Sequence, residues 1–172
     1  FYPDGGYYEG VGYAEYMLRN LVISTEALFH CCGTDYGLGS ARGFSETGSL
    51  FVYLQTPEES FNFHDSTPGA LSVSFPYWFG LRYGEYETAH QAWEQNHLRR
   101  APMEALGLLY YNKMIDQSGA ANTAEQPLDK YFSGIDTGSF RNSFHAVHPT
   151  FVGFHGGWTH LYHDMLDLGS FM

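Results

Sequence analysis

The spacing of apolar residues changes near residue 125, and this change restricts the possible folds more than any other feature of the chain. Before it, apolar side chains recur at the three- and four-residue intervals that place them on one face of an α-helix. After it, short runs of aromatic and β-branched residues alternate with turn residues, a pattern typical of antiparallel strands. The sequence therefore predicts a mainly α fold with a β portion, divided into domains at 1–125 and 126–172.

The boundaries of the expected elements follow from glycine and proline. Helices are predicted over about 13–29, 44–54, 77–93 and 102–113, the third interrupted near Gly84, with Gly33 ending the first and Pro57 closing the second. Small polar residues at 115–126 predict a linker. Strands are predicted at 129–135, 138–144 and 150–154, and a final apolar run covers 168–172.

Composition excludes several classes of partner. The formal net charge of −11 argues against binding a nucleic acid. It is also unfavourable for an anionic polymer, although a local cluster of the basic residues Arg82, His97, Arg99, Arg100 and Arg141 would outweigh it. No apolar stretch reaches the roughly 20 residues that span a bilayer. Aromatic residues make up 18% of the chain and often neighbour polar ones, which suits stacking on sugars as well as core packing.

The chain ends and the two cysteines give little information about the function. The chain starts at Phe1 without an initiator Met and stops within an apolar run, so we expect a piece of a longer protein. The rest of that parent chain would then be a partner, and the isolated piece would have little activity. Adjacent Cys31 and Cys32 indicate neither a disulfide framework nor a zinc knuckle.

Three loops carry candidate functional residues. Glycines in residues 1–12 allow Tyr8 and Glu9 to approach a ligand closely. In residues 57–76, His64 and Asp65 are framed by aromatics; they fit a structural turn and a binding site equally well. A strand beginning at Thr150 breaks at Gly156-Gly157, and the loop after it holds Trp158, His160, Tyr162, His163, Asp164 and Asp167. Such a group favours a site, whereas any one of these residues alone would more often be structural.

Four segments in order resemble heparinase II/III-type polysaccharide lyases. They are Pro3–Tyr13, the Phe61-Asn-Phe-His-Asp65 loop, the Phe140-Arg-Asn-Ser-Phe144 run and the His163-to-Phe171 ending. The resemblance implies a partial (α/α) toroid of helical hairpins followed by the first strands of an antiparallel β-sandwich. It also implies β-elimination of an acidic, uronic-acid-containing polysaccharide in a cleft between the two parts.

The resemblance also implies roles for individual residues. His163 matches the histidine of the family's ending motif and is the first candidate for catalysis, with His64 and Tyr8 as further catalytic candidates. The expected substrate-binding residues are Glu9, Asp65, Arg141, Trp158 and Tyr162. A periplasmic or secreted location would fit the family, and the sequence leaves a cytoplasmic one open.

Two departures from the family keep other readings open. Relatives bind a structural zinc through a second histidine where this chain has Met165, so no metal or other cofactor is expected. Relatives also tend to carry a catalytic tyrosine near the position of Phe63 and His64. One alternative is a glycoside hydrolase on a helical toroid, which needs two carboxylates, such as Glu9 with Asp65 or Asp167. Another is a carbohydrate-binding fragment without catalysis.

Overall fold

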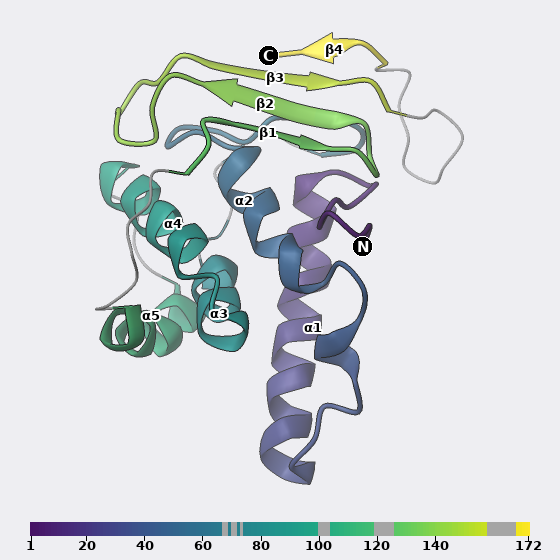
Figure 1. Ribbon diagram of the computed structural model, residues 1–172, viewed down its shortest axis with the longest axis vertical. Helices are drawn as coiled ribbons and strands as arrows, with labels where there is room; N and C mark the ends of the chain where they lie inside the picture. The colour runs from purple at the N-terminus through teal and green to yellow at the C-terminus, as the bar shows by residue number, and fades with distance from the viewer. Residues whose placement is uncertain (67–68, 70–71, 73, 100–103, 119–125, 158–167) are drawn as a thin grey trace.

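A helical layer carries a small antiparallel sheet at one end (Figure 1). This computed structural model describes residues 1–66, 69, 72, 74–99, 104–118, 126–157 and 168–172. Within these residues the chain forms five α-helices and one four-stranded antiparallel sheet, so the predicted mainly α fold with a β portion is confirmed. The short helix α2 lies directly under the sheet, and the long helix α1 runs away from it (Figure 1).

Helix α1 spans Val11–Cys32, slightly longer than the predicted 13–29. Its buried residues recur at three- and four-residue steps: Val11, Ala14, Leu18, Val22 and Thr25. Gly33 ends the helix in the left-handed conformation, φ 70°, and its N–H donates to the carbonyl of Phe29. Glycine adopts this conformation without a Cβ clash, so the predicted stop is confirmed.

The predicted helix over 44–54 is only partly α-helical. After a 3₁₀ turn at Leu38–Ser40, a second 3₁₀ segment covers Ser45–Ser49 and leads into α2, Leu50–Tyr53. The Ser49 hydroxyl donates to the carbonyl of Glu46 at 2.8 Å, three residues back. Hydroxyls that bond nearby carbonyls compete with regular α-helix geometry, which explains the tighter turn. All four residues of α2 are buried, as its low polar content predicts.

The predicted helix over 77–93 is a pair of helices. Helix α3 spans Ser74–Tyr83 and α4 spans Tyr86–Arg99, and Gly84 between them has φ 78°. Helix α5 spans Ala105–Ser118 and packs, like α4, against α3. The predicted start at Pro102 lies outside the described residues. Helix α5 occupies 115–118 of the predicted linker, and 119–125 also lie outside the described residues.

The four strands follow one another across the sheet. They are β1 Asp129–Phe132, β2 Thr137–Arg141, β3 Phe151–His155 and β4 Ser170–Phe171, each antiparallel to the next in the order β1-β2-β3-β4. Alternate residues face the helices, and these include buried Phe132, Ser139 and His155. The other face exposes large apolar side chains: Tyr131, Phe140, Val152 and Phe171. The predicted strands are therefore confirmed with bounds shifted by a few residues.

Polar anchors fasten the sheet to α2. The Arg141 guanidinium donates from Nη2 to the carbonyl oxygens of Val52 at 3.1 Å and Tyr53 at 2.6 Å. Ser139 Oγ also donates to the Tyr53 carbonyl, at 2.6 Å. Arg141 is only 7% exposed, and this burial lowers its pKa to about 10. The helical and β portions thus share one packed core, while their division into domains at 125 stays a prediction.

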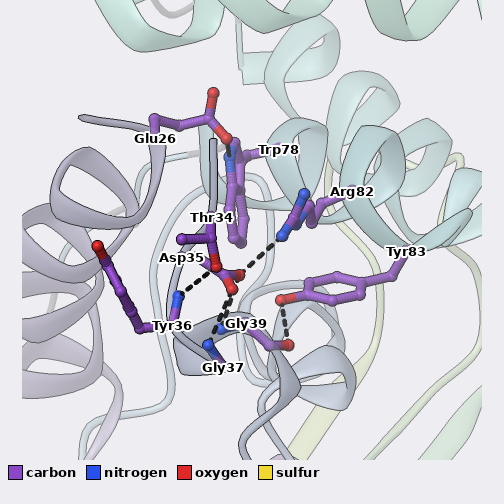
Figure 2. A network of polar contacts seen from close by, with 9 residues as sticks. All are labelled: Glu26, Thr34, Asp35, Tyr36, Gly37, Gly39, Trp78, Arg82 and Tyr83. Atoms are coloured by element: carbon purple, nitrogen blue, oxygen red, sulfur yellow. Dashed lines mark hydrogen bonds and ion pairs between the residues drawn. The ribbon is translucent and has the colours of Figure 1, made fainter. Parts of the chain in front are cut away.

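A second polar network ties the turn after α1 to α3 (Figure 2). Asp35 accepts hydrogen bonds from the N–H groups of Gly37 at 3.0 Å and Gly39 at 3.1 Å, and from Arg82 at 2.7 Å. Tyr83 completes it by donating to the carbonyl of Gly39. The charge of Arg82 is therefore offset by Asp35, which weakens its expected contribution to a local basic cluster. His97 stacks on Trp93 at 5.3 Å, and Arg100 lies outside the described residues.

No helix in the described part of the chain is both long and apolar enough to cross a membrane.

Candidate functional site

The N-terminal loop is held against the sheet by Asp4. Its carboxylate accepts from the N–H of Gly134 at 2.9 Å, from Ser133 Oγ at 3.0 Å and from the N–H of Gly6 at 3.1 Å. Burial alone would raise the pKa of Asp4, but these hydrogen bonds outweigh it and hold the pKa below its usual value. The segment that follows, with Tyr8 and Glu9, is thereby fixed beside the β1–β2 turn.

The loop at 61–66 lies against this N-terminal segment. The Gly12 N–H donates to Ser66 Oγ at 3.1 Å, and the Tyr13 hydroxyl donates to Asp65 Oδ2 at 3.0 Å. Gly10 has φ 88°, and a Cβ there would lie 2.9 Å from the carbonyl oxygen of Phe63. Glycine is required at this position both by its backbone conformation and by the close approach of the second loop.

The end of β3 contributes a residue that the sequence analysis did not single out, His155. Its imidazole stacks on Phe63 with ring centroids 4.7 Å apart and meets the His64 ring edge-to-face at 4.5 Å. His155 is 1% exposed and its Nδ1 lies 2.6 Å from Thr137 Oγ1. The available signal was its place at the end of a predicted strand, directly before Gly156-Gly157.

Two phenols of the site have raised pKa values. Tyr7 donates to Glu9 Oε2 at 2.9 Å, and burial, followed by this hydrogen bond, raises the pKa of Tyr7 well above its usual value. The hydrogen bond to Asp65 likewise raises the pKa of Tyr13. Both phenols therefore act as hydrogen-bond donors, and the carboxylates of Glu9 and Asp65 orient them.

The structure brings together some of the predicted site residues and separates another. Tyr8, Glu9, His64 and Asp65 lie on two adjoining loops, with Tyr8 packed on Tyr7 at 5.4 Å between ring centroids. His64 has a left-handed backbone, φ 55°, which is uncommon outside glycine. Trp158, Tyr162 and His163 lie outside the described residues, as do Met165 and Asp167.

Arg141, predicted to bind substrate, is placed differently. It ends β2, whereas Thr137, the partner of His155, begins that strand. Its Nη2 is directed at backbone carbonyls of α2, and its guanidinium lies over the Phe144 ring at 4.3 Å. The structure therefore gives Arg141 an anchoring role, because a buried guanidinium engaged with α2 is not presented to a polysaccharide.

The described side chains offer no obvious metal centre. Among them there is no group of three or more His, Cys, Asp or Glu residues placed to hold one ion. The chemistry that the described part of the site supports is proton transfer and hydrogen bonding by imidazole, phenol and carboxylate.

No protein-family model matches the chain, and no curated protein matches it.

Proposed function

We propose that this chain is part of a polysaccharide lyase that cleaves a uronic-acid-containing glycan by β-elimination. The observation that carries the proposal is the meeting of segments distant in sequence, 7–13, 61–66 and the end of β3, at one place. They bring phenols, carboxylates and two imidazoles together. The order of motifs that resembles heparinase II/III-type lyases points to the same chemistry.

The reaction requires a base and an acid. A base removes the C5 proton of the uronate, the C4–O4 bond breaks as the C4–C5 double bond forms, and an acid gives a proton to the departing O4. We assign His64 to the base and Tyr8 to the acid, with His163 acting on the same substrate from its own loop. Since Glu9 and Asp65 accept hydrogen bonds from Tyr7 and Tyr13, their role is to orient these phenols toward the glycan.

The larger architecture belongs to the same proposal. We assign the helices to part of an (α/α) toroid and the sheet to the first strands of a β-sandwich. The sheet supports this assignment because its outer face exposes aromatic side chains, as the inner face of a sandwich would. Rings of Tyr131, Phe140 and Phe154 stack there at 5.6 to 6.0 Å, which is typical of a face that packs on apolar neighbours.

The test is the nature of the product. The full-length parent protein is incubated with heparin, heparan sulfate, alginate and chondroitin sulfate, and ultraviolet absorbance is followed, because elimination creates a conjugated double bond and hydrolysis does not. We expect His64→Ala and Tyr8→Phe each to lower kcat by about 10² or more while the melting temperature stays within a few degrees. The matched control is His148→Ala, at an exposed histidine paired with Glu58.

The second candidate is a glycoside hydrolase, favoured by the placement of Glu9 and Asp65 on adjoining loops. Two carboxylates across a glycosidic bond are what that reaction needs. New reducing ends without ultraviolet absorbance would support it and would exclude the lyase. Glycan binding without any product would instead indicate the third reading, a carbohydrate-binding fragment.

A further inference from the structure

The buried histidine His155 has a ring orientation that its neighbours determine. It pairs with Thr137 across strands β2 and β3, and both side chains face the helices. Thr137 Oγ1 lies 3.0 Å from the carbonyl oxygen of Ile135 and 2.6 Å from His155 Nδ1. The Thr137 hydroxyl is placed to donate its single proton to the Ile135 carbonyl, which can only accept. With that proton on Ile135, the hydrogen bond to His155 runs from Nδ1–H to Oγ1.

We infer that His155 is held as the Nδ1–H tautomer, with the lone pair of the neutral ring on Nε2, and that it is a positioning residue for His64. This second part rests on the proposed function. Free histidine favours a proton on Nε2, so the opposite tautomer is a distinct and measurable property. In this protein the Thr137 hydroxyl determines which tautomer His155 adopts.

Two further neighbours restrict the orientation of the His155 ring. Phe63 stacks on it at an interplanar angle of 25°. At its far edge, a Cβ on residue 157 would overlap Cε1 and Nε2, so only glycine fits the chain there. Thr137, Phe63 and Gly157 thus leave the imidazole one orientation.

His64 depends on this fixed ring. Its left-handed backbone, φ 55°, is unfavourable for a residue with a Cβ and must be held by surrounding contacts. One of these contacts is the edge-to-face packing of His64 on His155, with ring centroids 4.5 Å apart and an interplanar angle of 80°. Removing the Thr137 hydroxyl would let the His155 ring change tautomer or turn, and the His64 imidazole would move with it.

The first test is nuclear magnetic resonance of the ¹⁵N-histidine-labelled protein, with His155 assigned by the signals lost in His155→Asn. We expect the Nδ1 shift of a protonated nitrogen and the Nε2 shift of an unprotonated one. In Thr137→Val we expect this pattern to be lost and the His64 ring signals to move, whereas Thr137→Ser should restore both. An Nε2–H tautomer in the unmodified protein overturns the inference, and unmoved His64 signals in Thr137→Val overturn its positioning role.

The second test uses turnover on whichever glycan the protein cleaves. Thr137→Val should lower kcat by up to about 10² with little change in KM, because misplacing a catalytic group by about 1 Å has this effect. Thr137→Ser should recover most of the rate. Thr25→Val, the same change at a buried position on α1, is the control and should leave kcat unchanged. A full-length parent protein with the predicted tautomer but no activity on any of these glycans would refute the proposed function and leave the tautomer assignment intact.

Discussion

At the scale of single residues, Arg141 shows what a sequence motif cannot reveal. In the run Phe140-Arg-Asn-Ser-Phe144, an arginine beside polar residues looks suited to binding a carboxylate. In the structure it shares the inward face of β2 with Thr137 and Ser139, where all three side chains are buried and polar. A polar residue on an inward position breaks the alternation rule that sequence reading depends on. Its partners, two backbone carbonyls of α2, have no signature in the sequence.

Replacing Arg141 by Ala should lower the free energy of unfolding by about 2 to 4 kcal/mol, because two buried carbonyl oxygens of α2 each lose one of their hydrogen-bond donors and the guanidinium leaves a cavity. Urea denaturation at neutral pH measures this. Arg19→Ala, at an exposed position on α1, should change stability by at most about 0.5 kcal/mol. A stable Arg141→Ala protein with weakened glycan binding would instead restore the substrate-binding role predicted for it.

Asp35 should make stability depend on acid pH. Hydrogen bonds from Gly37, then Gly39 and Arg82, outweigh the effect of burial and hold the pKa of Asp35 below its unfolded value of about 3.8. A depressed pKa means that the stabilisation is complete above the unfolded value and is lost as pH falls through the folded one.

Asp35→Asn should therefore be less stable than the unmodified protein at pH 7, and this difference in stability should narrow as the pH falls below the unfolded pKa of about 3.8. Urea unfolding at neutral and at acid pH gives the comparison, and Asp129→Asn, at an exposed carboxylate, is the control. A gap that stays constant with pH would show that the ionised carboxylate is not what stabilises the turn in Figure 2.

At the scale of elements, the sequence predicts those helices and strands whose apolar residues recur at a regular spacing. Helix α1 and strands β1 to β3 were found because a regular apolar spacing and a clear stop mark each of them. The 3₁₀ segment at Ser45–Ser49 was read as α-helix, since a three-residue and a four-residue repeat look alike over so short a run. The sequence predicts only part of the site: it indicates the two loops with Tyr8 and His64, but the place of His155 depends on its cross-strand partner Thr137, which only the strand register reveals.

The contact between these two loops can be tested through glycine. Gly10 and Gly33 both have positive φ, but a Cβ at Gly33 would meet nothing within 4 Å, whereas one at Gly10 would meet Phe63. Gly33→Ala should cost about 1 kcal/mol from backbone strain alone. Gly10→Ala should cost clearly more and should raise the hydrogen-exchange rates of residues 61–66. If both variants lose the same stability and the hydrogen-exchange rates of residues 61–66 do not change, the contact between the two loops contributes little to the fold.

At the scale of the whole molecule, the sheet has two faces of opposite character. The inner face packs on α2 and joins the helical core, and the outer face exposes rings on neighbouring strands. Phe132 on β1 lies on the inner face and is 0% exposed, whereas Phe140 on the adjacent strand β2 lies on the outer face and is 53% exposed. The same amino acid should therefore contribute very differently to stability and to association.

Phe132→Ala should lower the free energy of unfolding by about 3 to 5 kcal/mol, the usual effect of emptying a buried aromatic site. Phe140→Ala should change it by less than about 1 kcal/mol and should reduce self-association, because it removes part of an exposed apolar patch. Chemical denaturation and light scattering of matched samples give the two readouts. A large loss of stability for Phe140→Ala would show that the outer face already contributes to the fold.

The bond between Asp4 and Gly134 has a consequence for how the protein is made. It joins residues 130 positions apart, so the amino-terminal loop has no anchor on the sheet until the turn after β1 has left the ribosome. Closing so long a span loses chain entropy that only a formed β1–β2 hairpin can offset. In refolding followed by pulsed hydrogen exchange, the amides of Gly6 and Gly134 should gain protection together and after those of α1. Early protection of Gly6 would contradict this order; otherwise the loop that carries Tyr8 and Glu9 reaches its place on the sheet only after helix α1 has formed.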